Sequence, residues 1–144
     1  MTCMSDKAFF DTHILVYAFD QSEPEKGKIA RQLIYDYGCQ GNLILSTQVL
    51  QEFYVATTRM GKKMLSVEEA EEIINDFAEY PLIQIDRVII SRAMKRHQSK
   101  IFSFWDSLIV EAALESGATT LFSEDMHNGL VIGSLTISNP FSCI

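Results

Sequence analysis

The stretch Ala8-Phe9-Phe10-Asp11-Thr12 (AFFDT) places a carboxylate and a hydroxyl directly after a short apolar run. A short apolar run bounded by a polar residue is typical of a buried strand, so the pattern predicts a strand that ends at Asp11. Asp also favours the N-terminus of a helix, and capping a short helix is one interpretation of Asp11. In the other interpretation, the strand end directs Asp11 toward a functional site, where Thr12 holds the carboxylate or a bound water.

Short apolar runs alternate with longer helical patterns over the whole chain. Ser22 with Glu25, and Ser66 with Glu69, have the spacing of capping boxes, and Asp86 can cap another helix. We expect strands at residues 7–11, 43–45, 82–85, 119–122 and 135–137, and helices at 12–19, 22–37, 47–60, 66–80, 87–97 and 104–116. This alternation predicts an α/β fold, a single domain (residues 1–144) with a mostly parallel sheet of about five strands and helices on both faces.

Composition and charge limit the classes of protein to which the chain can belong. With 144 residues, of which 47% are hydrophobic and 22% charged, it can build a core of its own. The net charge of −7 argues against binding of nucleic acid through bulk positive charge, but it is compatible with a local basic strip. Cys3, Cys39 and Cys143 form no C-x-x-C pair, and no apolar stretch approaches a membrane span or a signal-peptide core. We therefore expect a reducing cytoplasm and no membrane association.

Asp106 lies near the start of the expected helix 104–116, which is apolar around most of its circumference. Ser107, Glu111 and Glu115 repeat every four residues and are expected to form the stripe that faces water. At about 100° per residue, Asp106 then points roughly 140° away from the middle of that stripe, toward the packed side. A carboxylate there needs a partner, such as a metal ion. The alternative is a helix cap or a first-turn acid favoured by the helix dipole.

Three further acids follow expected strands. Glu52 lies early in the helix after the second strand, at the edge of an apolar stripe, where a solvated glutamate is the simpler interpretation. Glu124 and Asp125 follow the fourth strand in the sequence Ser123-Glu124-Asp125. The sequence does not choose between these two acids, and turn chemistry alone is also compatible with them.

The positions of these acids relative to the strands predict a common site. In a parallel α/β sheet, the carboxyl ends of the strands share one edge, where ligands bind. We therefore expect Asp11, Glu52, Asp106 and Asp125 to converge there. Converging carboxylates repel one another and are costly to bury unless a cation joins them. Oxygen ligands of this kind suit Mg²⁺ or Mn²⁺.

The ordered set of motifs resembles a PIN domain, and in particular the VapC-type toxin nucleases of toxin–antitoxin pairs. The resembling blocks run from one end of the chain to the other: Phe9 to Tyr17, Ser46 to Phe53, Phe104 to Ala113, Thr120 to Gly129, and Ser138 to Phe141. The order of the blocks, rather than any single block, carries the resemblance. It implies a PIN-like (Rossmann-like) fold and the catalytic, metal-binding acids Asp11, Glu52, Asp106 and Asp125, supported by Thr12, Ser123 and Glu124.

The same resemblance implies a function. The implied function is that of an endoribonuclease that cleaves RNA with Mg²⁺ or Mn²⁺ and acts as the toxin of a type II toxin–antitoxin pair. The implied partners are a small antitoxin protein, which inhibits the enzyme, and a second copy of the chain in a homodimer. The chain departs from the family at His13, where Asn is frequent. We interpret this position as lying behind the direct ligands, so that metal binding is retained.

Two groups of basic residues are candidates for contact with RNA. The first, around the end of helix 47–60, is Arg59, Lys62 and Lys63. The second, on and after helix 87–97, includes Arg92, Arg96 and Lys100, whose spacing of four residues predicts a stripe on one face. Contact with the RNA backbone, above all by Arg59 and this stripe, is one hypothesis, and a solvated helix face is the other.

Two other functions are compatible with the sequence. A phosphatase that uses a strand-end Asp as nucleophile needs a second Asp two residues later, where this chain has His13. A catalytically inactive PIN-like fold would serve as an interaction module, although retention of all four acids argues against it. RNA cleavage that is lost on chelation separates the nuclease from the module, and a trapped aspartyl-phosphate would identify the phosphatase. We expect Trp105 in the core or an interface rather than as a stacking platform for bases.

Overall fold

One sheet of six strands organises the computed structural model, which describes residues 6–144. Its order is β3-β2-β1-β4-β6-β5, and every neighbouring pair is parallel except β5 and β6. The strands are β1 (Ala8–Phe10), β2 (Leu43–Ser46), β3 (Leu82–Ile83), β4 (Thr120–Phe122), β5 (Val131–Ile132) and β6 (Leu135–Ser138). The predicted α/β class and mostly parallel sheet are thus confirmed.

The sixth strand, β5, was not expected. It forms an antiparallel hairpin with β6, in which Ile132 pairs with Leu135. The two residues between them begin with Gly133, whose φ of 61° suits the first position of a tight hairpin turn. Two strand residues are too few for a periodicity signal. The Gly133-Ser134 dipeptide between apolar residues was the turn signal that could have revealed the hairpin.

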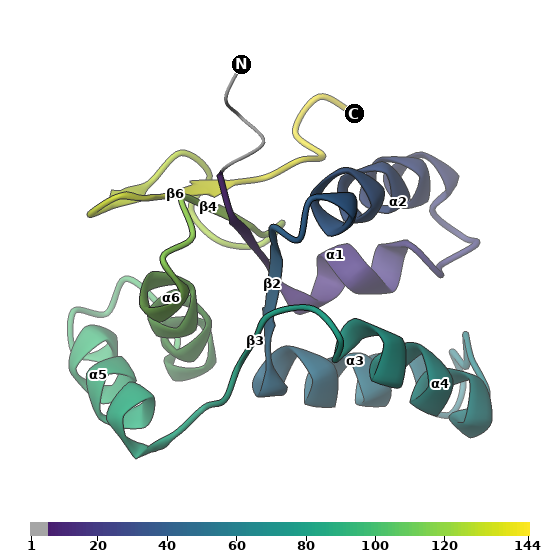
Figure 1. The fold of residues 1–144 in the computed structure, drawn as a ribbon, viewed down its shortest axis with the longest axis horizontal. Coiled ribbons are helices and arrows are strands. Elements are labelled where there is room, and N and C mark those ends of the chain that lie inside the picture. Colours follow the sequence, from purple (N-terminus) through teal and green to yellow (C-terminus); the bar gives the residue numbers. More distant parts are fainter. Residues whose placement is uncertain (1–5) are drawn as a thin grey trace.

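Helices cover both faces of the sheet, as predicted. Figure 1 shows α5 and α6 on one side of the strands and α1, α2, α3 and α4 on the other. Their bounds are α1 (Thr12–Tyr17), α2 (Pro24–Cys39), α3 (Thr47–Thr58), α4 (Val67–Phe77), α5 (Arg87–His97) and α6 (Phe104–Ser116). Within residues 6–144, no helix is both long and apolar enough to cross a lipid bilayer.

Two of the three predicted helix starts are confirmed. Ser66 and Glu69 form the capping box of α4, and the Asp86 carboxylate accepts from the backbone of α5. The box at Ser22 is wrong, because α2 begins at Pro24 and its cap residue makes no side-chain bond. Proline presets the helical φ at a first position, so the helix starts there without a capping box. Ser22 instead donates through its N–H and hydroxyl to Asp20, at 3.0 and 2.6 Å.

The central strand β1 fixes the position of Asp11. Ala8, Phe9 and Phe10 are 0% exposed, and β1 lies between β2 and β4. Removing such apolar surface from water contributes roughly 25 cal/mol per Å². The N–H of Asp11 donates to the carbonyl of Phe122 on β4 at 3.0 Å. The carboxyl end of β1 is therefore anchored in the middle of the sheet edge, directly before α1.

The cysteines of the described chain are isolated. Cys39 and Cys143 are exposed and form no disulfide, in agreement with the sequence. Cys3 lies outside the described residues.

Candidate active site

Four acids from distant parts of the sequence line one pocket of about 290 Å³. Asp11 follows β1, Glu52 lies on α3, Asp106 lies in the first turn of α6, and Asp125 follows β4. The four acids thus come from the edge of the sheet, from one helix on each face and from one loop. The pocket is lined by Asp11, Thr12, His13, Gln48, Glu52, Ala56, Trp105, Asp106, Ile109 and Asp125.

Asp11 is held by hydrogen bonds to both oxygens of its carboxylate. Oδ1 accepts from the N–H of Thr12 at 2.7 Å, so Asp11 also caps α1. Oδ2 accepts from the hydroxyl of Ser123 at 2.8 Å. The pKa of Asp11 is raised to about 6, mainly by burial, against the lowering effect of these two bonds and with a smaller contribution from the charges of Asp106 and Glu52. Asp11 therefore both caps α1 and lines the pocket.

Glu52 is fixed by two side chains. Its Oε1 accepts from the hydroxyl of Thr12 at 2.6 Å, and its Oε2 accepts from the amide of Gln48 at 3.1 Å. The Gln48 amide also donates to the carbonyl of Trp105 at 3.2 Å, which links α3 to the start of α6. Sequence reasoning missed Gln48. Its signal was the spacing of four residues from Glu52, which places both on one helix face.

Asp106 faces the pocket from the first turn of α6. The cap of this helix is Ser103, whose hydroxyl accepts from the N–H of Asp106 at 3.0 Å. The alternative in which Asp106 is itself the cap is therefore wrong. Burial raises the pKa of Asp106, opposed by the bond to Ser103, and the charges of Asp125 and Glu52 add to the rise. The charges of neighbouring acids in the pocket therefore contribute to the raised pKa values of both Asp11 and Asp106.

The structure separates Glu124 from Asp125. Glu124 accepts from the hydroxyl of Tyr17 and from the ammonium of Lys26, each at 2.5 Å. Although burial raises the pKa of Glu124, these two bonds hold it below its usual value. Asp125 is exposed and lines the pocket with the other acids. Asp125 is consequently the fourth acid of the pocket, and Glu124 belongs to a neighbouring ion pair.

The predicted water-facing stripe of α6 is wrong at Ser107 and Glu111 but correct at Glu115, whose side chain is 50% exposed. Ser107 and Glu111 are buried, because α5 packs on this face. Arg96 of α5 forms an ion pair with Glu111, and Arg92 pairs with Glu115 at 2.8 Å. Because Arg92 and Arg96 carry the charge opposite to that of the α6 acids, α5 can pack against this polar face of α6.

The predicted basic stripe on α5 is also corrected. The helix ends at His97, and Lys100 lies beyond it with a left-handed φ of 64°. Arg92 and Arg96 point to the acids of α6. The three side chains therefore do not extend one helix face. Trp105 does not lie in the core either, since it is 63% exposed at the rim of the pocket.

The pocket has the chemistry of a divalent-metal site. Its donors are carboxylate and hydroxyl oxygens, and the raised pKa values of Asp11 and Asp106 reflect burial and repulsion that a cation would relieve. Among residues 6–144, the buried Oε1 of Gln48 has no hydrogen-bond partner.

No preformed cluster of three His, Cys, Asp or Glu ligands occurs within residues 6–144. Mg²⁺ usually retains several waters and takes only one or two carboxylates directly. The acids therefore fit an ion that is held by one or two of them, with the others contacting its waters.

Comparison with known proteins agrees with this architecture. A toxin–antitoxin complex from Klebsiella pneumoniae has a TM-score of 0.66 at 17% identity, over 94% of this chain and 98% of that chain. The Mycobacterium tuberculosis toxin VapC20, described as cleaving the sarcin-ricin loop, has a TM-score of 0.63 at 16% identity, over 83% of this chain and 92% of that chain. FitAcB from Neisseria gonorrhoeae has a TM-score of 0.65 at 17% identity, over 94% of this chain and 99% of that chain.

Sequence comparison adds the family. No curated protein matches the chain. The model of the PIN domain does, and it covers residues 8–127, a range that includes all four acids of the pocket. From this match, the chain belongs to the PIN domain family.

Proposed function

We propose that this protein is a metal-dependent endoribonuclease and the toxin of a type II toxin–antitoxin pair, acting in the cytoplasm. The observation that carries the proposal is the convergence of Asp11, Glu52, Asp106 and Asp125 on one pocket at the carboxyl edge of the sheet. Like charges that converge on one pocket, three of them partly buried, repel one another and destabilise a fold. A binding site for a cation is the functional reason to keep them.

Mg²⁺ or Mn²⁺ would supply a water activated for attack and would neutralise charge on the scissile phosphate. Asp11 and Asp106, whose pKa values are raised, are the direct ligands in this proposal. Thr12 and Ser123 orient Asp11 through their hydrogen bonds. Glu52 and the exposed Asp125 accept hydrogen bonds from water bound in the pocket. The protein thus contributes position and negative charge, and no side-chain nucleophile is needed.

The toxin role is supported by the solved structures that share the fold. They include toxin–antitoxin complexes and a toxin described as cleaving the sarcin-ricin loop. By the same analogy we propose a homodimer and a small antitoxin as partner. A basic side chain of that partner, an Arg or a Lys, would inhibit the enzyme by competing with the metal for the carboxylates.

RNA cleavage by the purified protein tests the proposal. The expected result is cleavage of RNA with Mg²⁺ or Mn²⁺, loss of cleavage on chelation and loss in Asp106→Asn. Asp76→Asn is the matched control, because Asp76 is an exposed acid on α4 outside the pocket. If the wild type binds neither metal and cuts no RNA under any of these conditions, the protein is an interaction module.

A further inference from the structure

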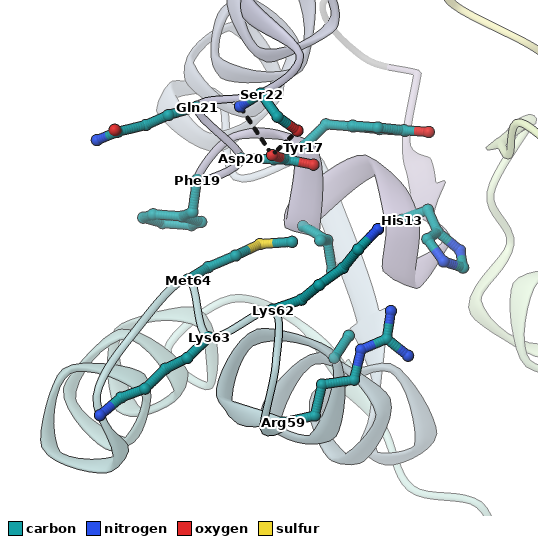
Figure 2. Close-up of a pocket in the computed structure, with 12 residues that line it drawn as sticks. His13, Tyr17, Phe19, Asp20, Gln21, Ser22, Arg59, Lys62, Lys63 and Met64 are labelled. Carbon is teal, nitrogen blue, oxygen red and sulfur yellow. Dashed lines mark hydrogen bonds between the residues drawn. The ribbon is translucent and has the colours of Figure 1, made fainter.

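A second and larger pocket adjoins the acidic one. It encloses about 580 Å³ between α1 and the segment after α3, and we call it the basic pocket because Arg59, Lys62 and Lys63 line it. His13 and Ala56 line both pockets, so the two hollows share a wall. Figure 2 shows the side chains around the basic pocket. Cations therefore lie next to the proposed catalytic acids.

The loop that carries these cations has a defined conformation. Its base is closed by the carbonyl of Thr57, which accepts from the N–H groups of Met64 at 2.9 Å and Leu65 at 3.0 Å. Its tip contains Gly61 with a φ of 91°, which a residue with a side chain adopts only at a cost. Ordered main-chain bonds at the base hold the basic side chains at the rim of the pocket.

Two of the cations point toward His13, which lines both pockets. In Figure 2, the side chains of Arg59 and Lys62 reach toward His13, whereas Lys63 points away. Within residues 6–144, neither Arg59 nor Lys62 forms an ion pair, whereas Lys26, Arg92 and Arg96 each do. Two charges without an acidic partner thus face the wall that the pockets share.

The positive charges of Arg59 and Lys62 are opposite in sign to the net charge of the protein. The net charge is −7, so RNA is repelled on average and needs a local positive surface close to the acids. Asp20 is the one acid of the basic pocket, and it accepts the two bonds from Ser22. Basic residues near a helix C-terminus also stabilise the helix dipole. That effect does not require them to point toward His13.

We propose that Arg59 and Lys62 bind a backbone phosphate of the RNA next to the one that is cleaved. The scissile phosphate would lie over the acids, and the strand would continue past His13 into the basic pocket. Arg binds phosphate through two N–H groups and Lys as a point charge, so the pair provides position and attraction without sequence selectivity. The inference rests on the proposed ribonuclease function and adds to it the direction in which the RNA strand leaves the acidic pocket.

The test measures RNA binding without cleavage. A fluorescently labelled single-stranded oligoribonucleotide is titrated with protein carrying Asp106→Asn, in Mg²⁺, over a range of salt concentrations. The double variant Arg59→Gln/Lys62→Gln is compared with Lys28→Gln/Arg87→Gln. The control pair also removes one Lys and one Arg, both exposed and outside the two pockets.

Each phosphate of a single strand that the protein neutralises contributes about 0.7 to the slope of log Kobs against log salt. Because the two cations share one phosphate in this proposal, the pocket variant should bind more weakly, with a slope about 0.7 smaller, and the control should keep the wild-type slope. Equal binding by both double variants would overturn the inference while leaving the ribonuclease proposal intact. The pocket would instead belong to a protein partner if the pocket variant kept RNA affinity but lost inhibition by that partner. If no form binds or cleaves RNA, the proposed function itself fails.

Discussion

The hydroxyl of Thr12 donates a 2.6 Å hydrogen bond to Oε1 of Glu52, which lies 40 residues away in the sequence. Thr12 also donates its backbone N–H to Asp11. One residue therefore connects two of the four acids, and it joins the start of α1 to α3. Thr12 therefore helps to orient both carboxylates, with its hydroxyl on Glu52 and its backbone N–H on Asp11, together with Gln48 and Ser123.

Replacing Asp106 by Asn should abolish RNA cleavage while the fold is retained. The amide keeps the shape of the side chain but removes a charge that we assign to metal binding. Since outer-sphere partners of a metal are worth about 10–100-fold, loss of a direct ligand should cost roughly 100-fold or more. Stability in metal-free buffer should hold or rise, because repulsion with Asp125 and Glu52 is relieved. Initial cleavage rates and thermal unfolding in EDTA are the measurements, and a wild-type rate would rule out the proposed role.

The contribution of Asp11 to the stability of the metal-free protein should fall as the pH rises from about 4 to 6. Burial raises the pKa of Asp11 from 3.8 to about 6, so in this window the folded protein binds a proton that the unfolded chain has released. Its contribution to the free energy of unfolding therefore falls with pH, by up to about 3 kcal/mol at 1.36 kcal/mol per unit. Asp11→Asn should lack this dependence and should exceed the wild type in stability at pH 7.5.

Urea denaturation in EDTA at pH 4, 6 and 7.5 measures the difference between wild type and Asp11→Asn. Other groups titrate in both proteins, so the comparison isolates Asp11. Added Mg²⁺ should stabilise the wild type at pH 7.5 and leave the variant unchanged. A stability difference that is constant over this pH range would contradict the role of Asp11 burial.

Gln48→Met should weaken metal binding without unfolding the protein. Gln48 donates to Glu52 and to the carbonyl of Trp105, so its loss releases one carboxylate from its orientation. Loss of such an orienting partner typically costs about 10–100-fold in metal affinity or activity. A titration of the cleavage rate with Mg²⁺ should show a higher half-saturating concentration. Gln51→Met, at an exposed position of the same helix, is the control and should behave as the wild type.

Arg96→Met should destabilise the protein far more than Arg92→Met. Arg96 pairs with Glu111, whose side chain is 8% exposed, so its removal leaves a buried charge unpaired at a cost of roughly 3 kcal/mol. The side chains of Arg92 and Glu115 are 54% and 50% exposed, and such a pair is worth about 1 kcal/mol or less. Chemical denaturation of both variants gives the comparison. Similar stabilities would show that the Arg96 pair is not structural.

Expression of this chain alone should slow bacterial growth and reduce RNA integrity. A small partner protein should relieve both effects by placing a basic side chain in the acidic pocket. The measurements are growth curves and gel analysis of total RNA after induction, with Asp11→Ala as the inactive control. Equal growth of the two strains with intact RNA in each would favour the interaction module over the toxin.

Local sequence patterns were sufficient for most of the fold. Apolar runs located the buried strands β1, β2 and β4, and the Ser66–Glu69 spacing located the start of α4. These features depend on residues a few positions apart, so the sequence displays them directly. Because the carboxyl ends of parallel strands share an edge, the same patterns placed Asp11 and Glu52 near a common site.

The sequence by itself determined the alternation of elements, the parallel sheet and the acids available at its edge. Only the tertiary structure decided which neighbours each charge meets. Asp125 rather than Glu124 lines the pocket because Tyr17 and Lys26 bind Glu124. Glu111 of α6 is covered because Arg96 of α5 pairs with it, whereas Glu115 stays half-exposed beside Arg92. Periodicity shows how polar a helix face is, but partners distant in sequence determine whether that face meets water or an opposite charge.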